Sequence, residues 1–161
     1  MIVITLLLLW ALFIGAVLTY IAQQVINGGK SLDFKNFEAV EIPYVTIDIQ
    51  GNLMNMVVDT GCAVSLLNIP SISNCELMYK KSGKSVNLSA ITSDRVNSDG
   101  ITIDFNVGKK KVTEDFYLQN TDDFGNFNTI HGITLHGLLG SSFFEKNNCK
   151  IDFKTHQLII A

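Results

Sequence analysis

Hydrophobic and polar positions follow two different patterns, one in the first two dozen residues and another in the rest of the chain. From Met1 to Ala22 no side chain is charged, and the run is rich in Leu, Ile and Val. A helix crosses the hydrocarbon core of a bilayer with about 20 apolar residues, so this stretch is long enough. It lacks the basic start and the small-residue cleavage site of a secretory signal peptide. The pattern therefore predicts an uncleaved transmembrane helix over residues 1–24, with a cleaved signal as the alternative.

Charges near this segment bear on the side of the membrane that the rest of the chain would occupy. No Lys or Arg precedes the segment, whereas Lys30 and Lys35 follow it closely. Cytoplasmic flanks of membrane helices carry an excess of Lys and Arg, which favours a cytoplasmic C-terminal part by a thin margin. The sequence thus predicts a single-pass membrane localisation and leaves the side open. Residues 25–38, which include a polar run at 27–31, are predicted to be a linker.

After residue 38, short runs alternate between apolar and polar positions with a period of two, which is typical of half-buried β-strands. The runs pair into three predicted hairpins: 45–49 with 53–58, 101–107 with 111–118, and 150–153 with 157–160. Gly140–Asn147, with a Ser near its start and a Lys near its end, predicts a short helix. The acidic pair at 122–123 is predicted to lie in a solvated loop. Residues 39–161 are therefore predicted to form one all-β domain with one short C-terminal helix.

Composition narrows the classes of function. The net charge is −3 and no basic stripe is present, which argues against a nucleic-acid partner. The three His residues show no metal-ligand spacing and the three Cys residues form no C-x-x-C pair, so no metal site is predicted. Separate thiols are the main expectation. One disulfide, Cys62–Cys75 or Cys75–Cys149, is the alternative if the domain faces an oxidising compartment.

The candidate catalytic residue is Asp59, in the triplet Asp59-Thr60-Gly61 that directly follows the apolar run Met56–Val58. Hydrolysis of a peptide bond by water needs a general base to activate the water and an acid to protonate the leaving group. Two carboxyls about 3 Å apart can share one proton and fill both roles, because both cannot ionise at that distance. Gly61 permits the tight turn that this arrangement requires, and the Thr60 hydroxyl can hydrogen-bond to a partner loop.

A second motif makes the triplet more specific. The apolar segment Gly137–Gly140 runs into the predicted helix, and a predicted hairpin over residues 42–58 leads into Asp59. Together with the closing segment Asn148–Phe153, these features resemble the retropepsin-like aspartic protease family over roughly residues 41–161. The resemblance implies a retropepsin-like closed β barrel and an aspartic endopeptidase that needs no cofactor. It also implies a polypeptide substrate bound in an extended conformation.

The same resemblance implies that one chain supplies only half of an active site. The sequence holds no second D-T-G or D-S-G triplet, so the dyad would come from two copies of Asp59 in a homodimer with a two-fold axis. In the family, chain ends from both subunits interleave in a shared sheet, and the apolar terminus Leu158–Ala161 would suit that role. A plain edge strand is the other interpretation of this terminus.

Two features depart from the pattern of the family. Cys62 stands where the family usually has Ala or Ser; it is small enough to pack there, although an oxidised thiol beside the dyad would block the site. The flap, the hairpin that closes over substrate, is expected between Val86 and Val96, and its tip around Ala90–Arg95 has no Gly. These departures motivate an alternative function, in which the same fold is a non-catalytic binding or dimerisation module at the membrane.

Overall fold

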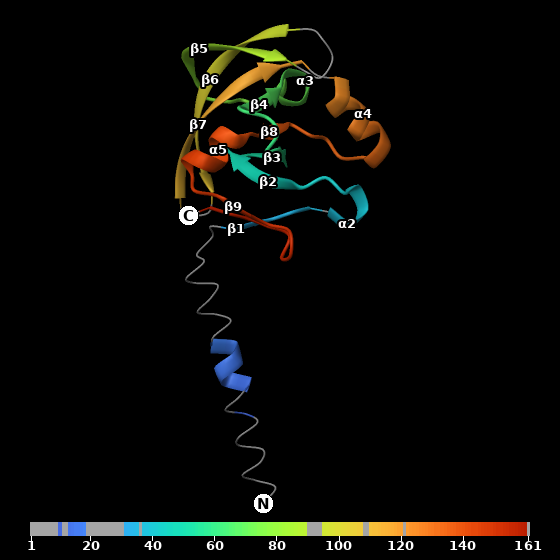
Figure 1. Cartoon of the computed structure of the whole chain (residues 1–161), viewed down its shortest axis with the longest axis vertical. Helices are drawn as coiled ribbons and strands as arrows, with labels where there is room; N and C mark the ends of the chain where they lie inside the picture. The colour runs from blue at the N-terminus through green and yellow to red at the C-terminus, as the bar shows by residue number, and fades with distance from the viewer. Residues whose placement is uncertain are drawn as a thin grey trace, which may run out of the picture.

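The computed structural model describes residue 10 and residues 13–18, 31–35, 37–89, 95–107, 110–120 and 122–160. Residue 10 and residues 13–18 are helical, and the remaining described residues form a domain that is mostly β with short helices (Figure 1). The elements of this domain are, in chain order, β1 (Ser31–Asp33), α2 (Phe37–Val40), β2 (Tyr44–Ile49), β3 (Asn52–Val58), β4 (Ser65–Asn68), α3 (Ile69–Ile72), β5 (Lys80–Ser89), β6 (Arg95–Val107), β7 (Lys110–Gln119), α4 (Asp122–His131), β8 (Gly137–Leu139), α5 (Ser141–Lys146), β9 (Lys150–Asp152) and β10 (Gln157–Ile159).

The predicted membrane localisation is corrected by the structure. Among the described residues, no helix is both long enough and apolar enough to cross a membrane. An apolar composition predicts a membrane span only if the residues also form one continuous helix of about 20 residues. Most of the predicted anchor at 1–24 lies outside the described residues, which include only residue 10 and residues 13–18 of it.

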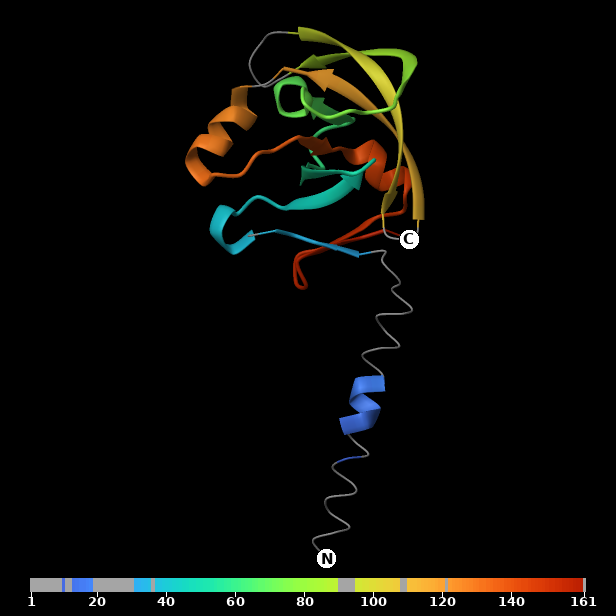
Figure 2. The same ribbon diagram turned by 180° about the vertical axis from the view of Figure 1, so that it is seen from behind.

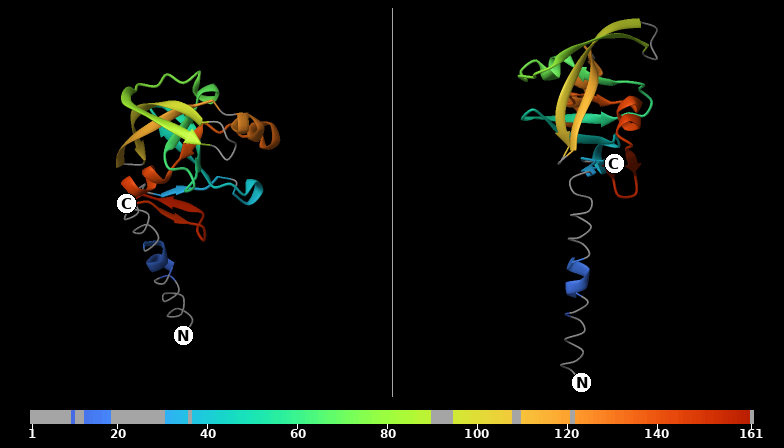
Figure 3. Two further views of the ribbon diagram at one scale, coloured as in Figure 1. Left: turned by 45° about the horizontal axis from the view of Figure 1, so that its top comes forward. Right: turned by 90° about the vertical axis from the view of Figure 1, so that its left-hand side faces the viewer.

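Seven of the described strands form one mixed sheet in the order β2-β3-β8-β4-β7-β6-β5. The predicted hairpin of β2 and β3 is confirmed, and it turns at Gln50 and Gly51, whose φ angles are +57° and +85°. Positive φ at both central residues is typical of two-residue hairpin turns, because it matches the twist of the flanking strands. The predicted hairpin of β6 and β7 is also confirmed, and these long strands run side by side across the domain (Figure 3).

Strand β8 lies between β3 and β4, although it is distant from both in the sequence. Its residue Leu138 pairs with Val57 in the parallel direction and with Leu66 in the antiparallel direction. The approach is close enough to require glycine at Gly137, because a Cβ there would lie 2.1 Å from the carbonyl oxygen of Leu66. Strand β8 therefore ties together the two strands on either side of the loop that carries Asp59.

The other three strands form a small antiparallel sheet in the order β1-β10-β9, on the lower side of the domain in Figure 1. Leu158 in β10 pairs with Leu32 in β1 and with Ile151 in β9, so β10 is the central strand. The interpretation of this terminus as an edge strand is therefore wrong, and both sides of β10 are occupied within its own chain. Residues 31–33 lie in the segment predicted to be a linker, and their pairing with β10 makes them part of the domain.

The main hydrophobic core takes side chains from both sheets and from α5, including Val58, Leu139 and Phe143. A second cluster, which contains Tyr44 and Phe127, packs α2 and α4 against the start of β2 (Figure 2). Helix α4 begins at Asp122, so the prediction of a loop at 122–123 is wrong. The domain therefore has more helices than the single one predicted. The pairings of the larger sheet run from β2 to β5 without closing into a barrel in the described part of the chain.

Candidate active site

Asp59 is the first residue after β3, at the start of the loop that leads to β4. The Asp59 amide donates a hydrogen bond of 3.0 Å to the carbonyl oxygen of Leu139, the last residue of β8. The amide of Val58 donates a bond of 2.8 Å to the carbonyl oxygen of Pro43, just before β2. The backbone at Asp59 is therefore held from two sides, while its side chain is only half-buried.

The loop turns back on the Asp59 carboxylate. The Gly61 amide donates a hydrogen bond of 2.8 Å to Asp59 Oδ1. A Cβ at Gly61 would lie 3.2 Å from the same oxygen, which is tighter than an ordinary contact, so glycine suits this turn. Thr60 and Gly61 are exposed and Cys62 is half-buried. The four predicted site residues thus form one surface turn, in which the Gly61 amide orients the carboxylate of Asp59.

The start of α5 holds the far side of this loop. The Ser141 hydroxyl donates to the carbonyl oxygens of Thr60 at 2.8 Å and of Cys62 at 3.1 Å, and the Ser141 amide donates to Cys62 at 2.8 Å. The Ser142 amide donates to the carbonyl oxygen of Ala63 at 3.2 Å. The sequence pattern places a Ser near the start of this helix, and in the structure the side chain of Ser141 binds the Asp59 loop instead of capping α5.

Gly140 lies between these contacts and depends on having no side chain. A Cβ at Gly140 would lie 2.3 Å from the carbonyl oxygen of Val64 and 2.9 Å from that of Cys62. Real Cβ atoms essentially never approach backbone atoms to 2.3 Å, so a side chain here would displace the loop. The second sequence motif therefore packs directly against the first.

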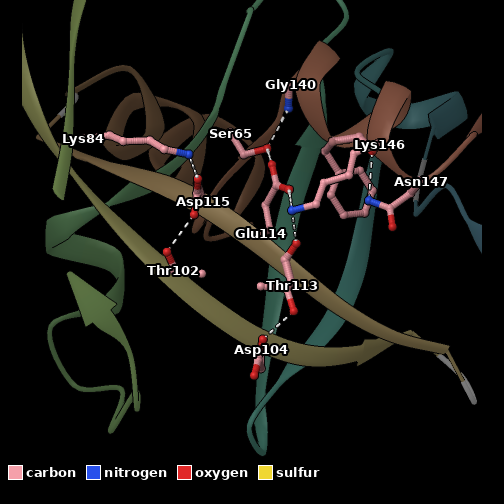
Figure 4. Close-up of polar contacts among 11 residues, drawn as sticks. Ser65, Lys84, Thr102, Asp104, Thr113, Glu114, Asp115, Gly140, Lys146 and Asn147 are labelled. Atoms are coloured by element: carbon pink, nitrogen blue, oxygen red, sulfur yellow. Dashed lines mark hydrogen bonds and ion pairs between the residues drawn. The ribbon is translucent and has the colours of Figure 1, made fainter. Parts of the chain in front are cut away.

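Next to this loop, Ser65, Glu114 and Gly140 form a buried polar cluster (Figure 4). The sequence patterns did not predict this cluster. The Ser65 hydroxyl donates a bond of 2.9 Å to Glu114 Oε1, and it accepts one of 3.2 Å from the Gly140 amide. Glu114 is 2% exposed, and burial raises the pKa of its carboxyl above the ordinary value, with partial compensation from the hydrogen bond of Ser65 and the charge of Lys146. The only signal in the sequence is the period of β7, which places Glu114 on the same face as Val112.

The three thiols are separate. Cys62, Cys75 and Cys149 are all free and half-buried, so neither of the two alternative disulfides is formed. Burial raises the pKa of the Cys149 thiol to about 11, which keeps it protonated at neutral pH. In the part of the chain that the structure describes, no three His, Cys, Asp or Glu side chains are grouped to hold a metal ion.

Strands β5 and β6 form the hairpin in which the flap was expected. Residues 90–94, most of its predicted tip, lie outside the described residues. At the base of the hairpin, Lys84 Nζ is 2.7 Å from Asp115 Oδ2, and the Thr102 hydroxyl donates to Asp115 Oδ1 at 2.7 Å. The bond from Lys84 holds the pKa of the Asp115 carboxyl below its ordinary value. The hairpin is thus fastened to β7 by an ion pair near the surface, since the Lys84 side chain is 64% exposed.

Similarity to known proteins is found among solved structures. No family model and no curated protein matches the sequence. One similar solved structure is the retroviral protease-like domain of Ddi1 from Leishmania major, with 17% identity over 73% of this chain and 86% of that chain and a TM-score of 0.48. Another is a retropepsin-like aspartic protease from Rickettsia conorii, with 17% identity over 81% and 87% of the two chains and a TM-score of 0.49.

Proposed function

We propose that this protein is an aspartic endopeptidase of retropepsin type, in which two Asp59 carboxyls from two copies of the chain form the active site. The observation that carries the proposal is the Asp59 loop itself. A half-exposed carboxylate, oriented by the Gly61 amide, sits on a backbone that β8 and α5 hold at Asp59, Thr60 and Cys62. This precision is what catalysis by positioned groups requires. The two sheets would together form the retropepsin-like closed β fold.

The chemistry follows from two carboxyls that share one proton. The ionised carboxyl takes a proton from a water molecule, and the oxygen of that water attacks the carbonyl carbon of the peptide bond. The protonated carboxyl donates its proton, so that the tetrahedral intermediate collapses with release of the amine and cleavage of the C–N bond. One chain offers one such carboxyl on this loop, because Asp59 is the only acid between β3 and β4. The site is therefore incomplete without a second copy.

The partner chain would meet the loop across a two-fold axis. Thr60 and Gly61 are exposed at its tip, so the Thr60 hydroxyl can reach the equivalent loop of the second copy. Strand β10 is already paired on both sides, so the dimer would have to use surfaces other than a free edge of β10. A polypeptide substrate would lie extended between the β5–β6 hairpin and the Asp59 loop.

One residue of the Asp59 loop favours a second candidate function. Cys62 is half-buried within the loop, at a position that is usually Ala or Ser in the family that the motifs resemble. The second function is a non-catalytic binding or dimerisation module with the same fold. It predicts a stable dimer that binds peptides and leaves them intact.

One experiment separates these functions. The full-length chain is incubated with a mixed peptide library at pH values from acid to neutral, and products are identified by mass spectrometry. The same is done with Asp59→Asn and with the matched control Glu76→Gln, an exposed acid outside the loop. Cleavage by the wild type and the control, lost in Asp59→Asn and blocked by pepstatin, supports the protease. If a dimer verified by analytical ultracentrifugation cleaves nothing, the binding module is the better account.

A further inference from the structure

The buried polar cluster behind the Asp59 loop has no part in the chemistry above. It joins Glu114 on β7, Ser65 on β4 and Gly140 before α5 (Figure 4). From this geometry we infer that Glu114 is a positioning residue for the Asp59 loop, acting through Ser65 and the backbone of Gly140. The inference deepens the proposed function, and its catalytic consequence rests on that proposal.

Glu114 occupies an inward-facing position in its strand. Val112, Glu114 and Phe116 are successive inward-facing residues of β7, and each is at most 2% exposed. A buried carboxyl lowers the free energy of unfolding unless it is hydrogen-bonded or paired, and a well-packed apolar side chain of similar size avoids that cost. Packing alone therefore does not explain a carboxyl between Val112 and Phe116.

Polar groups from two other elements surround the carboxyl of Glu114. Ser65, which is fully buried, donates to Glu114 Oε1, while Lys146 Nζ on α5 lies 3.8 Å from Glu114 Oε2. Lys146 also donates a bond of 2.5 Å to the carbonyl oxygen of Thr113, next to Glu114. The carboxyl therefore connects β4, β7 and α5 at one point. Without it, the Ser65 hydroxyl loses the acceptor that holds it toward the Gly140 amide.

The cluster is connected to the Asp59 loop through the chain neighbours of Gly140. Leu139, just before Gly140, accepts the hydrogen bond of the Asp59 amide. Ser141, just after Gly140, donates to the carbonyl oxygen of Cys62 from both its amide and its hydroxyl. Both anchors of the loop are thus neighbours of Gly140 in the chain, so a displaced Gly140 would move both.

Amide hydrogen exchange, measured by NMR on the full-length chain, tests the inference without relying on activity. Ser65→Ala and Glu114→Leu each break the connection, and we expect exchange of the Asp59 and Ser141 amides to become at least about tenfold faster. Exchange of the Leu158 amide in β10 should accelerate less than that of the loop amides, because it reports only the general loss of stability. Glu114→Gln keeps an acceptor oxygen for Ser65, so in this variant the Asp59 and Ser141 amides should exchange about as slowly as in the wild type. Glu145→Gln, the same change at an exposed site on α5, is the matched control.

Two results of the exchange experiment would contradict the inference. If the loop amides keep their wild-type exchange in Ser65→Ala, the inference is overturned. Faster exchange of the Leu158 amide to the same extent would assign Glu114 to general stability and would overturn it as well. If Glu114→Leu does not fold, Ser65→Ala makes the same break from the other partner and decides the question.

The kinetics of peptide cleavage provide a second test of the inference. A positioning role predicts that Ser65→Ala lowers kcat at least about tenfold with little change in KM, and that Glu114→Gln retains most of kcat. If the wild type cleaves and Ser65→Ala has the same kcat, the inference fails while the proposed function stands. If the loop amides respond as expected but the wild type cleaves nothing, the proposed function fails while the positioning role of Glu114 stands.

Discussion

The Asp59 loop and the β5–β6 hairpin are fastened to neighbouring residues of the same strand, but in opposite ways. The loop is supported by Glu114, which is buried and has a raised pKa. The hairpin is fastened by Asp115, whose pKa the hydrogen bond from Lys84 lowers. Because successive side chains of a strand point to opposite faces, one strand serves both regions. Strand β7 thus offers a buried, hydrogen-bonded support on its inner face and a solvent-screened contact on its outer face.

The two contacts should differ in strength for a physical reason. A buried polar group that loses its partner keeps its desolvation cost, whereas an exposed ion pair is screened and its partners return to water. Changes at the inner face should therefore alter the loop and the stability of the whole domain. Changes at the outer face should mainly affect the hairpin.

The largest effect is expected for Gly140→Ala. The added Cβ would meet the carbonyl oxygen of Val64 at 2.3 Å, and backbone cannot yield as the end of a side chain can. We expect a loss of about 3 kcal/mol or more in the free energy of unfolding, measured by urea denaturation. Gly61→Ala is the comparison, because its Cβ would meet a side-chain oxygen at 3.2 Å. An equal or larger loss for Gly61→Ala would contradict the assignment of Gly140 as the tighter position.

The next effect is expected for Ser65→Ala. This change leaves the buried Gly140 amide without its acceptor and Glu114 without one donor. We expect a loss of about 1–3 kcal/mol in the free energy of unfolding, measured by urea denaturation. Ser73→Ala, at an exposed serine, serves as the control. Equal unfolding midpoints for the two variants would show that the cluster does not support the domain.

A smaller and pH-dependent effect is expected from Glu114 itself. Its folded-state pKa is raised by burial, so its contribution to stability is fully present below the unfolded value of about 4.3 and is lost as pH rises through the folded value. The difference in the free energy of unfolding between wild type and Glu114→Gln should therefore decline with pH in that window, by up to about 1.4 kcal/mol per pH unit. Thermal unfolding at a series of pH values measures it. A difference that rises with pH would reverse the assigned sign.

The smallest effect is expected at the outer face. Asp115→Asn removes the ion pair with Lys84, which is largely exposed, and should shift the unfolding midpoint less than Ser65→Ala does. The shift should shrink further in 1 M salt, because salt screens exposed charges. A salt-independent loss as large as that of Ser65→Ala would abolish the contrast between the two faces of β7.

Local sequence patterns predicted the parts of the fold that depend on neighbouring residues. The β2–β3 hairpin, the β6–β7 hairpin and the short helix α5 all have such signals. Strand β1 has only three residues, and it forms because it pairs with β10 at the other end of the chain. Helix α4 contains Gly125 and two Asn residues, which favour helix poorly, and it is stabilised by the packing of Phe127 against the start of β2.

Local sequence patterns likewise indicate only a part of the candidate site. The triplet at Asp59 and the segment ending at Gly140 can be recognised because each has a characteristic local sequence. Glu114 and Ser65 cannot be recognised in the same way, because their roles arise from contacts between strands that the sequence does not place together. A charged residue in a strand is ordinarily exposed, and only the partners around Glu114 account for its burial.

The insertion of β8 between β3 and β4 has a consequence for the order of folding. The loop at Asp59 cannot reach its final geometry from local contacts, since Leu139 must first arrive from the other end of the domain. Contacts between such distant segments form slowly because closing a long loop costs conformational entropy. The β2–β3 hairpin can form early, and the geometry of the Asp59 loop would be among the last features to appear. A newly made chain would therefore pass through most of its folding before Asp59 is set in place.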